Sequence, residues 1–124
     1  MGVRKISEPA QIPVPGQKQI REYFGRVSTG TGQFSVAHMI APPGWEEPYQ
    51  TPEFDEITIV VRGRLQVEHS GGTEVVIPGE VLFVERGERV RYSNPFSENA
   101  EYWAICMPAF SPEGANREHT PSER

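Results

Sequence analysis

Glu56 is the strongest candidate in this sequence for a residue that carries out chemistry. Side chains alternate along an extended strand, so Gln50, Pro52, Phe54 and Glu56 share one face of the chain. A carboxylate among apolar side chains is costly unless it is paired or hydrogen-bonded. Burial would also raise its pKa and make it a usable general acid or base. We therefore expect Glu56 to be either catalytic or held by a structural partner such as a tyrosine hydroxyl or an arginine.

His38 is the second candidate. It lies beside Val36 and Ile40 on the apolar side of an alternating segment, so we expect it to face inward. Such a histidine is either a core residue with satisfied ring nitrogens or a ligand-binding residue. With Gln50 and Glu56 it could form a weak metal site of nitrogen and oxygen donors, although nothing in the spacing demands one.

Aromatic and acidic residues near these two candidates could complete a pocket. Trp45 and Tyr49 could form its aromatic edge, or equally a packed lid. Glu46, Glu47 and Glu53 form a local acidic cluster, which is expected to be solvated at the mouth of the pocket. Glu47 is the member that we expect to reach the ligand.

Other reactive side chains are not assigned a role. His69 and His119 are expected to be exposed, and Cys106 is expected to be a small buried hydrophobe with no base beside it. The sequence contains no phosphate-binding loop, dinucleotide fingerprint or Ser-His-Asp order.

Length and charge restrict the class of protein. A chain of 124 residues has room for one core. Its net charge of -5 argues against nucleic acid as a partner, because phosphate binding needs a basic face. No apolar run is long enough to span a membrane, and the first residues lack the apolar core of a secretory signal. With a single cysteine, the expected setting is a reducing cytoplasm.

Short strands between glycine and proline turns must position these residues. The expected strands are 33–40, 54–61, 65–69, 73–77, 81–84, 90–92 and 101–107. This pattern predicts a small antiparallel β-sandwich or barrel, and an immunoglobulin-like sandwich would fit it equally well although the Cys-Trp-Cys signature is absent. The expected organisation is an N-terminal arm at 1–29, a barrel at 30–110 and a polar tail at 111–124.

The spacing of glycines resembles the two motifs of the cupin superfamily. The matching positions are Gly44, Glu56 and Gly63 in the first motif and Gly79, Gly87 and Asn94 in the second. Within the superfamily, the run Phe54–Ile57, the turn Arg62–Leu65 and Trp103 ahead of Pro108 are similar to the ethanolamine-utilisation cupins. The resemblance implies an all-β jelly-roll barrel, the cupin double-stranded β-helix.

The metal-binding positions of that superfamily are altered here. Cupins commonly hold a metal ion with three histidines and the glutamate of the first motif. The corresponding positions are Gln50, Pro52, Glu56 and Val90. Pro52 and Val90 have no donor atom in their side chains, so the usual site is broken and no metal cofactor is expected.

The resemblance also implies which residues face the barrel interior. Gln50 and Glu56 would line it, and Tyr92 would share a strand face with the lost histidine position. Trp103 would donate a hydrogen bond inward or pack in the core. The favoured hypothesis is a small polar molecule bound by Glu56, Gln50, His38, Tyr92, Glu47, Tyr49 and Trp103.

Two alternatives remain open at this point. One is a metal-dependent isomerase, lyase or dioxygenase with an unusual ligand set around Glu56. The other is a structural or regulatory dimer without catalysis. The strand Glu56–Val61 is apolar on both faces, so one face must be covered outside the barrel. We therefore expect a homodimer, which in some cupins includes an exchanged N-terminal arm.

Overall fold

The chain folds almost entirely into β-strands. The computed structural model describes residues 2–119. Its strands are β1 (Ala10–Gln11), β2 (Gln19–Phe24), β3 (Ser35–Ala41), β4 (Asp55–Arg62), β5 (Leu65–His69), β6 (Gly72–Val76), β7 (Val81–Val84), β8 (Arg91–Ser93) and β9 (Ala100–Met107). A short helix, α1, spans Pro112–Ala115. Within residues 2–119, no helix has the length and apolar character that a membrane crossing requires.

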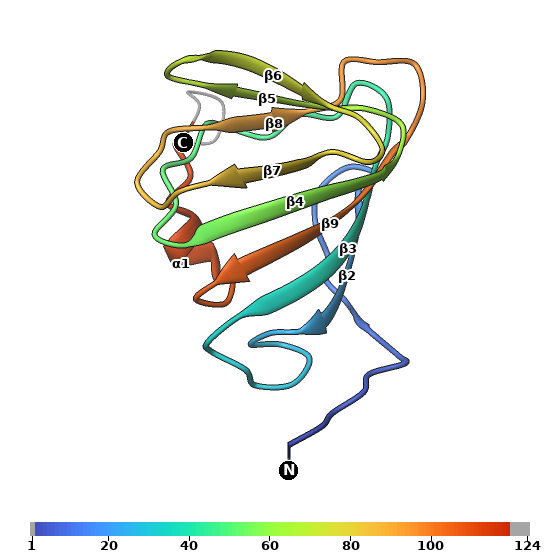
Figure 1. Ribbon diagram of the computed structural model, residues 1–124, viewed down its shortest axis with the longest axis vertical. Helices are drawn as coiled ribbons and strands as arrows, with labels where there is room; N and C mark the ends of the chain where they lie inside the picture. Colours follow the sequence, from blue (N-terminus) through green and yellow to red (C-terminus); the bar gives the residue numbers. More distant parts are fainter. Residues whose placement is uncertain (1, 120–124) are drawn as a thin grey trace.

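Two antiparallel sheets form the wall of a barrel (Figure 1). The larger sheet has the strand order β1-β2-β3-β9-β4-β7, and the smaller one has the order β6-β5-β8. Isolated bridges from Glu46 to Ser93 and from Gln50 to Val90 tie the segment before β4 to the region of β8. This arrangement confirms the prediction of an all-β jelly-roll barrel.

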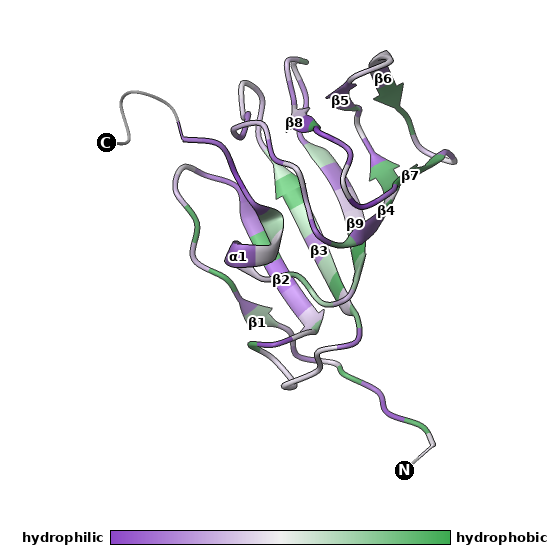
Figure 2. Ribbon diagram, turned by 90° about the vertical axis from the view of Figure 1, so that its left-hand side faces the viewer, coloured by the Kyte–Doolittle hydropathy of each residue, from purple (hydrophilic) through white to green (hydrophobic). Residues whose placement is uncertain are grey.

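The segment before residue 30, predicted as a polar arm, contributes two strands to the larger sheet. β2 pairs with β3, and β1 pairs with β2 at the edge of the sheet. Figure 2 shows β2 as mainly hydrophilic beside the more hydrophobic β3. At the other end of the chain, α1 lies near the start of β4 (Figure 1), and the rings of Phe54 and Phe110 pack 5.8 Å apart between their centroids. Residues from both ends of the chain therefore close the barrel.

The inner face of the larger sheet uses small side chains where the barrel is hollow. Burial alternates along β9, with Ala104 and Cys106 buried, and Ser35 and Ala37 are buried in the neighbouring β3. Larger residues form the main core beside this hollow, which consists chiefly of Val60, Leu65, Val67, Val76, Tyr92 and Tyr102. The change from large to small residues leaves space inside the barrel.

Two motif positions have structural roles. Gly63 has φ of 75°, and a Cβ atom there would lie 2.1 Å from the carbonyl oxygen of Asn99, so only glycine fits this turn. Asn94 is fully buried. Its amide donates to two backbone carbonyls at 3.0 and 2.7 Å and accepts from a backbone N–H at 3.0 Å. These residues fix the connections from β4 to β5 and from β8 to β9.

Candidate functional site

A cavity of about 420 Å³ lies inside the barrel. Strands β2, β3, β4, β8 and β9 contribute to its wall, together with the N-terminal segment and the region after β9. Its apolar lining includes Ile12, Val14, Ile20, Met39 and Ala104. Its polar lining includes Lys18, Glu47, Gln50, Glu56, Tyr92 and Arg117. An apolar chamber with a few converging polar groups is typical of a small-molecule site.

Glu56 extends from β4 into this cavity, as the strand alternation predicted. The residue is 8% exposed, its carboxylate lies close to the Tyr92 hydroxyl, and no described residue forms an ion pair with it. Burial and, to a smaller extent, the charge of Glu47 raise the pKa of Glu56 from 4.5 to about 7, although Lys18, Tyr92 and Arg117 oppose the rise. The carboxyl group can therefore both release and accept a proton near neutral pH.

Tyr92 lies in β8 and presents a buried hydroxyl to the same cavity. It is close enough to lower the pKa of Glu56, yet its oxygen lacks a partner with full hydrogen-bond geometry among the described residues. Burial also raises the pKa of Tyr92 well above its usual value, so the group remains a neutral phenol and a potential donor. A buried hydroxyl without a partner is uncommon in native proteins.

Gln50 and Glu47 also reach the cavity, as predicted. The backbone of Gln50 pairs with that of Val90 in both directions, at 2.9 and 2.8 Å. Arg117, near the end of the described chain, donates from Nε to the side-chain oxygen of Gln50 at 3.3 Å and lies 3.7 Å from the Glu47 carboxylate. Arg117 therefore contacts the side chains of both Gln50 and Glu47, whereas it forms no hydrogen bond or ion pair with Glu56.

Lys18 is a cavity residue that the sequence analysis missed. It immediately precedes β2, and its Nζ lies 3.8 Å from the centre of the Trp45 ring. The residue is partly exposed as a whole, but its ammonium end is enclosed. Burial lowers the pKa of Lys18 from 10.5 to about 8, although Glu47 and Glu56 oppose this change. No periodicity marks Lys18, because it belongs to an irregular segment before the strand.

His38 does not face the cavity, so the prediction of an inward orientation was wrong. The cavity-lining residues of β3 are Ser35, Ala37 and Met39, which places His38 on the opposite face. Its Nε2 lies 2.8 Å from the Glu101 carboxylate, and its ring packs against Trp103 at 4.9 Å between centroids. The more apolar face of this strand is the outer one, because the inner face uses small residues around the cavity.

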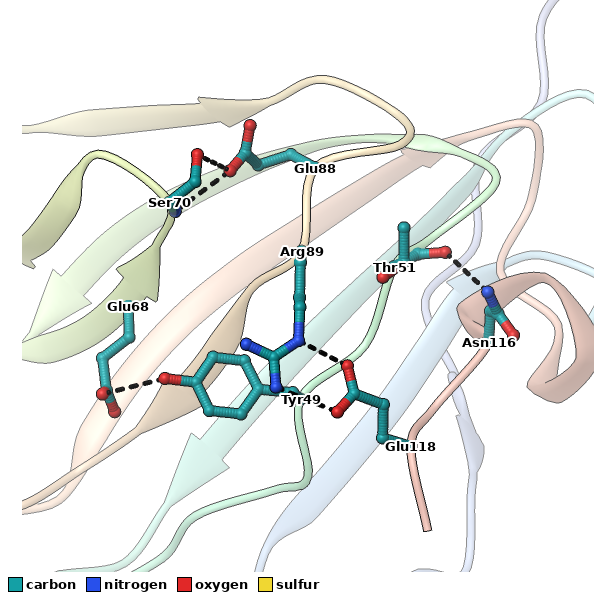
Figure 3. A network of polar contacts seen from close by, with 8 residues as sticks. All are labelled: Tyr49, Thr51, Glu68, Ser70, Glu88, Arg89, Asn116 and Glu118. Carbon is teal, nitrogen blue, oxygen red and sulfur yellow. Dashed lines mark hydrogen bonds and ion pairs between the residues drawn. The ribbon is translucent and has the colours of Figure 1, made fainter.

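Trp103 and Tyr49 also lie away from the cavity lining. Trp103 alternates with Tyr102 and Ala104, which do line the cavity, and its ring packs against Tyr23 on the outside of the sheet. The Tyr49 hydroxyl donates to Glu68 at 3.2 Å (Figure 3). Its ring also lies 3.8 Å from the Arg89 guanidinium. Both residues therefore support the wall from outside, and neither contacts the cavity.

Cys106 and the remaining histidines add no further reactive group to the cavity. Cys106 lines it, but burial raises the pKa of its thiol, which stays protonated at neutral pH. His69 pairs with Glu74 at 3.1 Å in the hairpin of β5 and β6, and His119 is exposed.

The residues in the cavity do not fit the metal ion that cupins commonly hold. Gln50 and Glu56 line the cavity at two of the four ligand positions, while Pro52 and Val90 are buried without a side-chain donor. Within residues 2–119, no group of three or more His, Cys, Asp or Glu side chains is arranged to hold a metal. A transition metal requires several such donors converging on one point.

The raised pKa of Glu56 predicts a specific dependence of stability on pH. Between about pH 4.5 and 7 the folded protein retains a proton that the unfolded chain has released, so stability falls as pH rises through this window. At about 1.4 kcal/mol for each pH unit, the loss amounts to at most about 3 kcal/mol. Glu56→Gln should remove this slope in urea unfolding at pH 5 and 7.5.

The matched control is Glu53→Gln, because Glu53 is exposed three residues earlier in the chain. It should retain the slope of the unsubstituted protein. An unchanged slope in Glu56→Gln would contradict the placement of an enclosed carboxylate at this position.

Comparison with curated proteins gives one relative that matches nearly the whole chain. The chain is 48% identical over 123 residues to a protein of Myxococcus xanthus named endoribonuclease YbeY. The match covers 99% of this chain and 41% of that protein. A second relative, acetate kinase EutQ of Salmonella typhimurium, is 35% identical over 59 residues, covering 48% of this chain and 25% of that protein. The chain thus spans less than half the length of either relative.

Solved structures support the same fold. An RmlC-like cupin from Shewanella frigidimarina superposes with a TM-score of 0.70 at 14% identity, covering 88% of this chain and 92% of that one. The EutQ protein of Clostridium difficile superposes with a TM-score of 0.63 at 20% identity, covering 82% and 73%. Residues 37–107 match the family described as the cupin domain. This range includes most of the barrel. The resemblance seen in the two glycine motifs is confirmed, and the chain belongs to the cupin family.

Proposed function

We propose that this chain binds a small polar molecule inside its barrel, using its own side chains in place of a metal ion. The observation that carries the proposal is that three polar groups converge on one cavity: the Glu56 carboxyl, the Lys18 ammonium and the Tyr92 hydroxyl. Among the described residues, the Tyr92 hydroxyl has no partner with full hydrogen-bond geometry, and neither Glu56 nor Lys18 forms an ion pair. Buried polar groups in native proteins are nearly always hydrogen-bonded. A ligand that supplies the missing partners would offset the cost of burying them.

The size and lining of the cavity favour a small ligand with both polar and apolar parts. Its volume of about 420 Å³ lies at the low end of the range for small-molecule sites. The apolar side chains of Ile20 and Met39 would contact the carbon skeleton. Glu56 and Tyr92 would bind hydroxyl or carbonyl groups. At neutral pH Glu56 supplies a donor and an acceptor in comparable populations, which suits a ligand that bears both.

Tyr92→Phe tests this proposal, because it removes the hydroxyl and little else. The free protein should be unchanged in stability or more stable by about 1 kcal/mol, since a buried hydroxyl without a partner is lost. A ligand found by a thermal-shift screen of small polar metabolites should bind at least tenfold more weakly to the variant, measured by calorimetry.

The matched control is Tyr49→Phe, whose hydroxyl donates to Glu68 outside the cavity. This variant should bind the ligand normally. Equal binding to the unsubstituted protein and to Tyr92→Phe would show that Tyr92 does not contact the ligand. Failure of every polar metabolite to shift the unfolding temperature would contradict the proposal itself.

We also propose that two copies of the chain associate through the outer face of the larger sheet. Apolar residues of β4 and β7 meet there in register, with Ile57 opposite Phe83 and Ile59 opposite Val81. Phe83 is 57% exposed and Val81 is 62% exposed, although both are large hydrophobic residues on an edge strand. Apolar surface of this kind is typical of protein interfaces. A second copy would cover it on both chains.

Sedimentation velocity tests this association. The unsubstituted chain should sediment as a dimer, and Phe83→Glu should shift it to a monomer because a carboxylate would be buried in the interface. Val27→Glu is the control, since Val27 is 70% exposed in a different region. A chain that sediments as a monomer at every concentration would refute the dimer.

A second candidate function comes from the match to the Myxococcus xanthus protein. Its name assigns it endoribonuclease activity, and 41% of its length is covered by the match. We infer a division of roles in which this chain binds a small ligand and does not itself cleave RNA. The net charge of -5 supports this division, because an RNA-binding face is expected to be basic.

Incubation of this chain alone with labelled single-stranded RNA tests the division of roles. The RNA should remain intact, and the chain should not retard it on a native gel at physiological salt. Cleavage that disappears in Glu56→Gln would instead assign nuclease chemistry to the barrel.

A further inference from the structure

Lys18 combines three features that ordinary surface lysines lack. Its Nζ lies 3.8 Å from the centre of the Trp45 ring and 5.4 Å from that of Tyr102. Among residues 2–119, no carboxylate or hydroxyl forms a hydrogen bond or ion pair with it. Lys18 also lines both the barrel cavity and a second hollow at the barrel surface, which is bordered by Pro42 and Trp45. Lys18 therefore lies where the two hollows adjoin.

This position favours the neutral amine, which is the nucleophilic form. An exposed lysine has a pKa near 10.4 and is almost wholly protonated at neutral pH. Burial lowers the pKa of Lys18 to about 8, so a substantial part of the population is unprotonated just above neutral pH. Desolvation in an apolar pocket is a recognised way to activate a lysine for attack on a carbonyl group.

The charges around Lys18 favour a neutral ligand over an anionic one. Arg117 lies near Glu47, with 3.7 Å between nitrogen and carboxylate oxygen, so these two side chains partly neutralise one another. Glu56 remains in the cavity beside Lys18, and its negative form would repel a carboxylate or phosphate. An aldehyde or ketone carries no such charge, and its polar oxygen can accept a hydrogen bond from Glu56 or Tyr92.

We propose that Lys18 forms an imine with small aldehydes or ketones that enter the cavity, an inference that rests on the proposed ligand-binding function. The Nζ lone pair attacks the carbonyl carbon, a C–N bond forms, and the carbonyl π electrons move to oxygen. The nitrogen loses a proton and the oxygen gains one, which gives a carbinolamine. The protonated Glu56 carboxyl then donates its proton to the departing hydroxyl group, and water leaves as the C=N bond forms.

The net reaction is amine plus carbonyl compound to imine plus water, with no oxidation or reduction. Glu56 is regenerated as an acid when the iminium nitrogen loses its proton. The apolar side chains around the amine limit access of water to the imine. This chemistry would explain why a lysine and a glutamate are enclosed together without forming a close ion pair.

Reductive trapping tests the proposal on the intact chain. The protein is incubated with glycolaldehyde and sodium cyanoborohydride at pH 7.5, and modified residues are located by peptide mass spectrometry. Lys5 and Lys18 are the only lysines in the sequence, and Lys5 is exposed, so it is an internal control. Lys18 should be modified at least tenfold faster than Lys5. Equal or slower modification of Lys18 would overturn the proposal.

Two further measurements separate this proposal from simple ligand binding. Glu56→Gln should slow the trapping at Lys18 at least tenfold without changing the rate at Lys5, whereas equal slowing at both would argue against Glu56 as the proton donor. Ethylene glycol, which lacks the carbonyl group, should raise the unfolding temperature without being trapped. If both compounds stabilise the protein and Lys18 is not modified, the cavity binds ligands and the imine proposal fails. If neither compound stabilises it and Lys18 is not modified, the imine proposal fails, whereas the binding proposal fails only if the whole metabolite screen is also negative.

Discussion

The enclosure of Glu56 and Lys18 in one apolar chamber is the constraint on which the site depends. Each group is costly to bury in its charged form, and neither forms a close ion pair. Burial therefore moves their pKa values toward one another, to about 7 and about 8. A folded protein that retains such a pair carries a cost in stability that a well-packed core would avoid. Binding of a ligand by this pair would explain why the protein retains it despite the cost in stability.

The rest of the barrel leaves this cavity unfilled and surrounds it on most sides. Small residues such as Ala37 and Ala104 on neighbouring strands leave the interior unfilled, while Val60 and Tyr102 pack the remainder. The N-terminal segment that carries Lys18 and the C-terminal segment that carries Arg117 both reach the cavity. Both segments therefore form part of the cavity wall.

The motif spacing predicted the fold and the part of the site that regular strands carry. Gln50, Glu56 and Tyr92 face the cavity because side chains alternate in strands or paired segments. His38 and Trp103 were placed on the wrong face, because hydrophobicity normally marks the inner side of a strand. Here the inner side holds small residues around a cavity, and the outer side is the more apolar. Lys18 and Arg117 could not be found from periodicity, since both belong to irregular segments that tertiary packing brings to the cavity.

The most direct test of this account is the pKa of Glu56 measured by NMR from its side-chain carboxyl carbon. The account predicts a midpoint near 7 in the free protein. It also predicts a further rise in Lys18→Met, because the nearby ammonium lowers the pKa of Glu56. A midpoint near the ordinary value of 4.5, unaffected by Lys18→Met, would show that the carboxylate is in contact with bulk water. That result would contradict the enclosed pair on which the proposed function rests.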